Sequence, residues 1–391
     1  MSRDGQDQKL IGERLRKARE NARITQADAA RDAGMARTTL VAIEQGVRRV
    51  RLEELQTLAR MYKTSANALL RDEAVHVDLV PRFRKTLDAA DTGIEEAVAL
   101  LADLARAEVE LENILGIKRS FNYPPERPIL AGDVRLQAEQ DALELRQRLG
   151  LGLAPIRDMI TLLEMDLGVR VYVRRFNPKI SGLFAYDEVL GACILLNANH
   201  PLARRNQTAG HETGHLVATR REPEVLLDHP TVNSREERYA DAFGRSFLTP
   251  SRAVMQKFHE VTAGAAQLSR RHVIILAHFF GVAREAMVRR LEELKLAKDG
   301  TWDWFARNGG ITDEHERQAL GDLKVADQYK TEANRPTTLR LATLAAEAYR
   351  RGILSEGQHA RMLRMDRVEL RALVDELGNE EGAGDGQLQL K

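Results

Sequence analysis

The sequence GHETGH at residues 210–215 places two imidazoles and a carboxylate close together along the chain. On an α-helix, residues four apart advance by about 400°, so the rings of His211 and His215 would project from one face and share one metal ion. Glu212 lies about 100° further round, where its carboxylate would flank a water molecule on the open side of the ion. The spacing therefore predicts a metal site in which Glu212 is the general base.

A third ligand is expected from the acidic segment that follows. On a helix, Glu237 and Asp241 are also four apart, so Glu237 can bind the ion while Asp241 accepts the far ring N–H of a ligating histidine. Glu237 could instead close a capping box with Ser234. Asn233 with Glu236 forms an equally good box, however, and leaves Glu237 free to bind metal.

Other polar residues are weaker candidates for a role in chemistry. Three of them could steady a developing oxyanion, although each is more typical of a surface or packed residue: Tyr239, His229 and His200. The single cysteine, Cys193, lies in an apolar run and is expected to be a buried core residue rather than a nucleophile.

Residues 131–298 resemble the ImmA/IrrE family of metallopeptidases, whose helix–helix core follows the gluzincin pattern. The matching segments are HETGH, ERYADAFGRSFLTP from Glu237, and ILAHFFGVAREAMVRRLEELKL towards the end. The resemblance implies one Zn²⁺ bound by His211, His215 and Glu237, with Glu212 as the base and Asp241 orienting His211. Family members usually place an aromatic residue ahead of the active-site helix, where this chain has Gln207; the difference concerns packing or substrate choice rather than the ligands.

Peptide hydrolysis is the reaction expected from such a site. Three protein ligands leave a fourth position for water, whose pKa a zinc ion would lower toward about 7. Glu212 would take the proton of that water and carry it to the leaving amine. A strand such as Ile180–Tyr186 is expected to hold an extended substrate by backbone pairing, which favours a flexible segment of a partner protein.

The N-terminal segment reads as a bundle of short amphipathic helices, with apolar residues spaced for one buried face at 11–18 and 52–59. Thr25 and Asp28 form a capping box that opens a helix running to Ala33, and Gly34 then supplies a left-handed turn. A further helix is expected from about Arg37 to the residue before Gly46. This order predicts helix-turn-helix geometry.

The segments TQADAARDAGMARTTLVAIEQG and LEELQTLARMYKTSANALL resemble the Xre, or lambda-repressor-like, DNA-binding domain. The resemblance implies a five-helix fold whose helix from Arg37 enters the major groove of a double-stranded operator. The implied base contacts are Arg37, Thr38 and Thr39, and the implied phosphate contacts are Gln26, Arg48 and Arg49. The alternative is a basic helical bundle that serves only as an interaction module.

Composition and charge agree with a folded protein that carries its positive charge at one end. The chain has 391 residues and 43% hydrophobic content, enough for two or three domains. No stretch reaches eighteen apolar residues and the N-terminus is polar, so we expect no membrane span or signal peptide and a cytoplasmic location. Residues 1–72 carry 15 Lys and Arg against 10 Asp and Glu.

The expected fold class is α+β and mostly α, divided into four segments. These are a helix-turn-helix domain at 1–72, a helical linker at 73–130, a zincin-like (gluzincin) peptidase domain with a small, mainly antiparallel sheet at 131–300, and a helical region with a disordered tail at 301–391. The last helices are expected to pad the peptidase core or a dimer interface rather than make second DNA contacts.

The combination of these segments predicts a regulator, expected to form a homodimer, that binds DNA and cleaves a specific repressor or partner protein, or itself, to control stress or mobile-element genes. Two alternatives stay open. One is a non-hydrolytic transcription factor that uses the peptidase fold as a metal or ligand sensor, and the other is an antitoxin-like repressor. The presence of Glu212 favours hydrolysis, because a purely sensory metal site requires ligands but no base.

Overall fold

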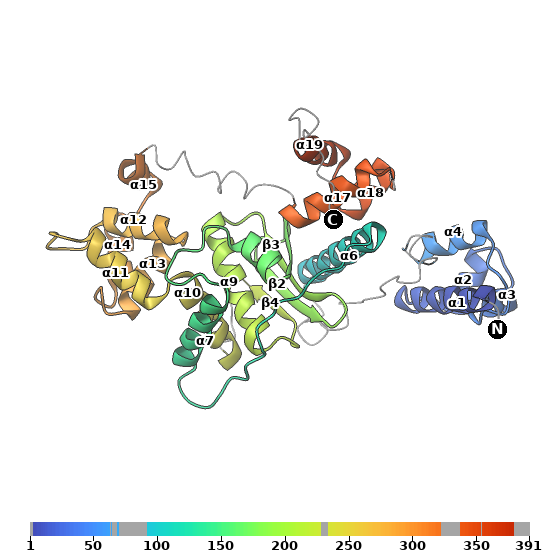
Figure 1. The fold of residues 1–391 in the computed structure, drawn as a ribbon, viewed down its shortest axis with the longest axis horizontal. Helices are drawn as coiled ribbons and strands as arrows, with labels where there is room; N and C mark the ends of the chain where they lie inside the picture. The colour runs from blue at the N-terminus through green and yellow to red at the C-terminus, as the bar shows by residue number, and fades with distance from the viewer. Residues whose placement is uncertain are drawn as a thin grey trace, which may run out of the picture. The chain divides into compact units, whose positions relative to one another are not determined.

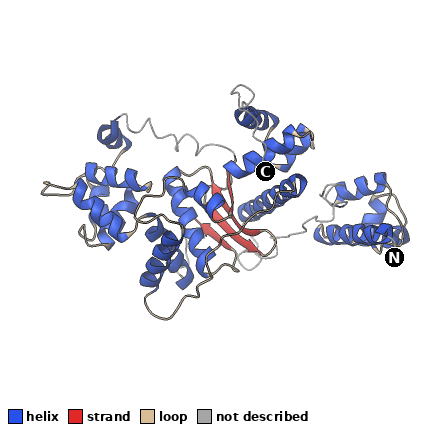
Figure 2. Ribbon diagram, viewed as in Figure 1, coloured by secondary structure: helices blue, strands red, loops and turns tan. Residues whose placement is uncertain are grey.

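The computed structural model describes residues 3–62, 64, 69, 92–227, 234–321, 337–352 and 354–378. The chain divides into two compact units. The first holds Met1–Asp78 with Arg106–Lys118, and the second holds Leu79–Ala105 with Arg119–Lys391. The described parts of both units are mostly helical, and the described strands all lie in the second unit (Figure 2). The predicted α+β, mostly α fold class is confirmed.

The first unit has the predicted helix-turn-helix order. Its described helices are α1 (Arg3–Asn21), α2 (Gln26–Asp32), α3 (Arg37–Glu44) and α4 (Leu52–Met61), followed in the chain by α6 (Thr92–Leu115), whose residues are divided between the units. Thr25 caps α2 by accepting the backbone N–H of Asp28 at 3.2 Å. Gly34 has a φ of +66°, the left-handed turn expected between α2 and α3. The fifth helix expected after α4 falls on residues that lie almost entirely outside the described ranges.

A buried carboxylate ties the helices of the first unit together. Glu44, at the end of α3, is only 4% exposed. It accepts hydrogen bonds from Arg19 on α1, at 2.6 and 3.0 Å, and from Gln26 on α2, at 2.8 Å. A Cβ atom at Gly12 would lie 2.4 Å from the carbonyl oxygen of Ile43, so the glycine allows α1 to approach α3 closely. Packing and paired charge therefore fix α1, α2 and α3 together.

The second unit is built on a four-stranded sheet, seen in red in Figure 2. Its strands are β1 (Arg170–Arg174), β2 (Ile180–Asp187), β3 (Gly191–Asn197) and β4 (Glu224–Leu227), in the spatial order β1-β3-β2-β4. β2 pairs with β3 and β4 in antiparallel fashion, whereas β1 and β3 are parallel. The sheet is thus mainly antiparallel, as predicted, but the short strand β4 was not predicted.

The strand order corrects one prediction about the substrate. β2 lies between β3 and β4, so both of its backbone edges already pair with neighbouring strands. The expectation that Ile180–Tyr186 pairs with an extended substrate is therefore wrong. On that side of the sheet, β4 is the outermost of the described strands, and it pairs only with β2 among them.

Helices cover the sheet and bring the acidic segment to the histidines. α9 (Leu202–Ala218) packs on β2 and β3, and α10 (Arg235–Leu248) packs on α9 and on α7 (Val134–Arg148), an arrangement that can be followed in Figure 1. α8 (Met159–Thr161) continues into a π-helical turn at Leu162–Asp166. Buried side chains of the sheet, α7, α9 and α10 form one hydrophobic core, including Phe184, Leu216 and Phe243.

The next helices extend this core. They are α11 (Ser251–Val261), α12 (Arg270–Phe280), α13 (Arg284–Glu293), α14 (Thr301–Arg307) and α15 (Asp313–Leu320). Gly281, with a φ of +66°, separates α12 from α13 as expected. Val273, Val288, Phe305 and Leu320 share a cluster, so α14 and α15 pack with α12 and α13. The boundary expected at residue 300 therefore falls inside a packed group of helices.

The last described helices, α17 (Leu339–Arg350), α18 (Glu356–Met362) and α19 (Arg367–Gly378), contact the sheet-bearing part of the chain. The buried carboxylate of Glu164, in the π-helical turn, accepts hydrogen bonds from the hydroxyl of Thr338 and the backbone N–H of Arg340. Arg174, at the end of β1, donates to the carbonyl of Leu363 at 3.2 Å. These contacts support the padding interpretation of the C-terminal helices. The expected disordered tail, residues 379–391, lies outside the described ranges.

Within the described residues, we find no helix that combines the length and the apolar character needed to cross a membrane.

Candidate metal centre and nucleic-acid interface

Three side chains from α9 and α10 converge at the predicted metal site. The Nε2 atoms of His211 and His215 lie 3.1 Å apart. Oε2 of Glu237 lies 3.4 Å from Nε2 of His211, and its Oε1 lies 3.3 Å from Nε2 of His215. A tetrahedral zinc ion with bonds of about 2.0–2.1 Å spaces its ligand atoms about 3.3 Å apart. The donor types and their spacing therefore fit Zn²⁺.

The other ring nitrogen of each histidine is held by a neighbour. Nδ1 of His211 lies 2.8 Å from Oδ1 of Asp241, the position predicted for this carboxylate. Nδ1 of His215 lies 2.9 Å from the hydroxyl of Thr219, which ends α9 and was not predicted. Because both Nδ1 atoms are engaged, both Nε2 atoms are directed to the shared site. The signal for Thr219 was its position four residues after His215.

Glycines allow α9 and α10 to approach closely enough for this convergence. A Cβ atom at Gly214 would lie 2.8 Å from the Cα of Ala240, and one at Gly244 would lie 2.6 Å from the backbone nitrogen of His211. A Cβ atom at Gly210 would lie 3.1 Å from the Cα of Gly244. The contacting atoms are backbone, which side-chain motion cannot relieve. Small residues four apart on each helix thus set the distance between the histidines and Glu237.

The start of α10 decides between the two capping arrangements. Ser234 is the cap, since its hydroxyl accepts the backbone N–H of Glu237 at 3.1 Å. Asn233, the other predicted cap, lies outside the described residues. The cap uses only the backbone of Glu237, so its carboxylate is still free to face the two histidines.

Glu212 is buried beside the histidines. The side chain is 0% exposed, and neither of its oxygens has a hydrogen-bond partner among the described residues. A Cβ atom at Gly182 on β2 would lie only 3.2 Å from Oε1 of Glu212, so the missing side chain leaves room for the carboxylate. A buried carboxylate without a partner is costly, and such groups are typically kept for chemistry or for an ion or water.

The electrostatics of the site favour a bound cation. Burial opposes charge on His211, but the carboxylates of Asp241 and Glu237 outweigh it and raise the pKa of that ring. Burial lowers the pKa of His215, which keeps this ring neutral as a metal ligand must be. Burial opposes ionisation of Glu237 as well, yet the two histidines hold the pKa of its carboxyl far below the usual range. Burial raises the pKa of Glu212 to about 8.

The three candidates for steadying an oxyanion do not gather at this site. The hydroxyl of Tyr239 donates to Asp141 at 2.7 Å, so it faces α7 rather than the histidines. Nε2 of His200 lies 3.2 Å from the carbonyl oxygen of Pro178, in the loop before β2. His229 lies outside the described residues. For Tyr239 and His200 the expectation is wrong, because their polar atoms point to other partners.

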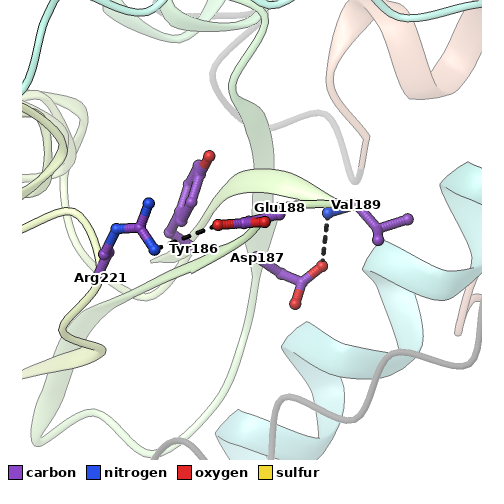
Figure 3. Close-up of a pocket in the computed structure, with 5 residues that line it drawn as sticks. All are labelled: Tyr186, Asp187, Glu188, Val189 and Arg221. Atoms are coloured by element: carbon purple, nitrogen blue, oxygen red, sulfur yellow. Dashed lines mark hydrogen bonds and ion pairs between the residues drawn. The ribbon is translucent and has the colours of Figure 1, made fainter.

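A pocket lies at the turn that joins β2 to β3. It is lined by Tyr186, Asp187, Glu188, Val189 and Arg221 (Figure 3). Arg221 forms an ion pair with Glu188 at 3.2 Å, and Asp187 accepts the backbone N–H of Val189 at 2.8 Å; both contacts are drawn in Figure 3. The charges lining this pocket are thus already used within the protein.

The residues predicted to contact DNA divide into two groups. Arg37 and Thr38, at the start of α3, are exposed, Thr39 is half-buried and Arg49 is exposed. The exposed side chains of Arg37, Thr38 and Arg49 are accessible to a ligand. Two others are engaged within the domain: Gln26 donates to Glu44, and Arg48 makes two hydrogen bonds to Glu54, at 2.9 and 3.1 Å.

Comparisons with known proteins agree with this division of the chain. Residues 10–72 match the sequence model of a helix-turn-helix domain, and residues 164–292 match that of the IrrE N-terminal-like domain, a peptidase family. A search of the curated proteins gave no match. The second match contains β1 to β4, α9 and α10, and therefore every side chain of the metal site. The chain thus joins a DNA-binding helix-turn-helix domain to an IrrE N-terminal-like domain with a peptidase fold.

Proposed function

We propose that this chain is a DNA-binding regulator whose second unit is a zinc-dependent endopeptidase. The observation that carries the proposal is Glu212, a fully buried carboxylate with no hydrogen-bond partner among the described residues, beside three side chains whose donor atoms are spaced for a metal ion. A site that only sensed a metal would need the three ligands but no unpaired acid. His211, His215 and Glu237 are the proposed zinc ligands, and Asp241 and Thr219 orient the rings.

When bound, zinc would polarise the carbonyl of the scissile peptide and make a neighbouring water more acidic. Glu212 would take a proton from that water and return it to the nitrogen of the leaving amine. The raised pKa of Glu212 suits both steps, since the carboxylate must accept a proton and then release it. Packing of α9 on β2 and the bare Gly182 hold Glu212 close to the strand.

We propose that an extended segment of the substrate pairs with β4 rather than with β2. β4 is the outer strand next to the metal site, and β-strand addition to such an edge selects flexible segments over folded ones. A repressor or other partner protein with an exposed linker would fit this requirement, as would a linker of a second copy of this chain. The helix-turn-helix domain would then place the peptidase near operator DNA.

Glu212→Gln tests the enzymatic proposal in the full-length protein. We expect zinc content, measured by mass spectrometry of the purified protein, to stay at one ion per chain. Cleavage of a peptide mixture prepared from a cell lysate should fall by a factor of about 10³, within the range for loss of a general base. Glu222→Gln, which removes an exposed carboxylate close to β4, is the control and should cleave like the wild type.

Equal cleavage by wild type and Glu212→Gln would contradict the proposal, as would zinc-free wild-type protein. If cellular gene regulation also survived the substitution, the sensory alternative would be favoured over hydrolysis.

A further inference from the structure

A third acidic side chain, Glu224, belongs to the face of the sheet that carries the metal site. The orientation of this face is set by β2. The ring of Phe184 stacks on that of His215, with centroids 6.4 Å apart and an interplanar angle of 27°. Gly182, two residues earlier, comes against Glu212. Residues two apart on a strand share a face, so this face of β2 is the one that looks onto α9.

The pairing of β4 with β2 then places Glu224. Phe184 and Glu224 are direct partners in the antiparallel register, and direct partners project their side chains to the same face. Glu224 therefore projects to the side of the sheet that holds His215 and Glu212. It does so from β4, the strand whose outer edge pairs with no other described strand.

Among the described residues, no Lys, Arg or His forms an ion pair with Glu224, although His211 attracts its charge from a greater distance. The two arginines that precede β4 are directed elsewhere: Arg221 pairs with Glu188, and Arg220 donates to the carbonyls of Leu216 and Pro124. Glu224 is nevertheless half-buried, and burial together with the charge of Glu237 raises its pKa to about 7.

Glu224 lies near two further carboxylates, those of Glu237 and Glu222, which repel its charge. A half-buried carboxylate without a counter-charge is destabilising unless a ligand supplies one. The unmatched charge lies on the edge strand, where the substrate backbone would run.

We propose that Glu224 is a specificity-determining residue that binds a cationic group of the substrate close to the scissile bond. This inference rests on the proposed peptidase function and deepens it, since it names the substrate class: an extended peptide with a lysine or arginine side chain, or a free amino terminus, near the bond that is cut. The carboxylate of Glu224 accepts hydrogen bonds from the ammonium or guanidinium group, and a charged partner keeps it ionised.

Phosphinic peptides, which mimic the tetrahedral stage of hydrolysis and bind without being cut, test this proposal in the zinc-loaded full chain. The series consists of N-acetylated peptides in which one lysine replaces alanine at each position in turn, with norleucine counterparts of equal length. A further peptide without lysine keeps its free amino terminus. Binding is measured by calorimetry.

In the wild type, we expect one lysine position, or the free amino terminus, to tighten binding about tenfold over its neutral counterpart, equivalent to about 1.4 kcal/mol. If a lysine peptide binds more tightly, Glu224 binds a side chain; if the peptide with the free amino terminus does, Glu224 binds that terminus. The advantage should disappear in Glu224→Gln and remain in Glu222→Gln. The neutral peptides should bind equally to all three proteins, which shows that Glu224→Gln is folded.

The same lysine preference in Glu224→Gln and wild type would overturn the inference, as would equal binding of all peptides to the wild type. Zinc content distinguishes failure of the Glu224 inference from failure of the proposed peptidase function. If the protein holds zinc and binds the neutral peptides without preference, only the role of Glu224 fails. If it holds no zinc, the proposed peptidase function fails, and the role of Glu224 with it.

Discussion

Two buried glutamates, one in each unit, differ in their hydrogen bonding. Glu44 in the helix-turn-helix domain is 4% exposed and accepts hydrogen bonds from Arg19 and Gln26. Glu212 in the peptidase fold is 0% exposed and accepts none from the described residues. Both lie where a glycine lets two elements approach closely, Gly12 in the first case and Gly182 in the second.

The difference separates a carboxylate that stabilises from one that is available to react. Glu44 fills its hydrogen-bonding capacity with groups from two other helices, so it fixes their arrangement. Neither oxygen of Glu212 is hydrogen-bonded within the described part of the chain, which costs stability and is the pattern expected of a residue kept for catalysis. The same residue type at similar burial thus stabilises the fold in one unit and is the proposed general base in the other.

The largest effect on stability is expected at Glu44. Glu44→Ala leaves the guanidinium of Arg19 buried without its carboxylate, which should destabilise the first unit by about 3 kcal/mol. Glu212→Gln should leave stability unchanged or raise it, because it replaces a buried carboxyl group that makes no hydrogen bond with the described residues. Thermal and urea unfolding measure both, with the exposed Glu53→Ala as control. Equal losses at Glu44 and Glu212 would contradict the comparison.

The approach of α9 to α10 should be the next most sensitive feature. A methyl group at Gly244 meets the backbone of His211, so Gly244→Ala should separate the helices, cost about 2 kcal/mol and weaken zinc binding. The control is Gly357→Ala in α18, where the nearest atom is the movable end of Arg367 at 3.2 Å, and stability should be kept or rise. Unfolding and zinc titration report both; unchanged zinc affinity in Gly244→Ala would count against the packing argument.

Orientation of the ligands should matter less than their presence. Asp241→Asn weakens the hydrogen bond that fixes His211, so zinc affinity should fall by about 10- to 100-fold without loss of folding. Competition with a fluorescent zinc chelator measures the change. Asp187→Asn, which alters a carboxylate at the β2–β3 turn, serves as the control. A wild-type affinity in Asp241→Asn would show that packing alone orients the ring.

DNA recognition should give the smallest and most position-dependent effect. Arg37→Ala removes an exposed guanidinium at the start of α3, which should cost about 1–2 kcal/mol at particular base pairs of the operator. Arg60→Ala, an exposed arginine on α4, is the control. Binding assays on a randomised DNA pool are the measurement. A loss that is uniform over all sequences would place Arg37 on phosphate instead of bases.

Local signals in the sequence predicted the parts of the fold that depend on neighbouring residues. The cap at Thr25, the left-handed turns at Gly34 and Gly281 and the shared face of His211 and His215 all follow from spacing along one segment. The convergence of Glu237 on the histidines was also predicted, whereas its role as a ligand stays a prediction. Apart from that convergence, which joins two helices, each of these features is set within a few residues of chain.

The features that escaped prediction depend on parts of the chain that are distant in sequence. β4 has only four residues, and its place beside β2 is a property of the sheet. The choice of β2 as the strand that pairs with substrate was wrong for the same reason, because strand order cannot be predicted from the sequences of the strands alone. Tyr239 was misplaced because its partner Asp141 lies on α7, 98 residues earlier in the chain. Without the strand order, nothing in the sequence placed Glu224 near the metal site.

The contact between Glu164 and the start of α17 joins residues that are 174 and 176 positions apart in the chain. A fragment cut at residue 300 would keep the acid but lose the hydroxyl and the amide that solvate it, and would uncover the end of β1 where Arg174 meets Leu363. The sheet-bearing part of the second unit therefore takes part of its packing and polar pairing from residues 338–363, and a fragment without them should be less stable than the whole unit.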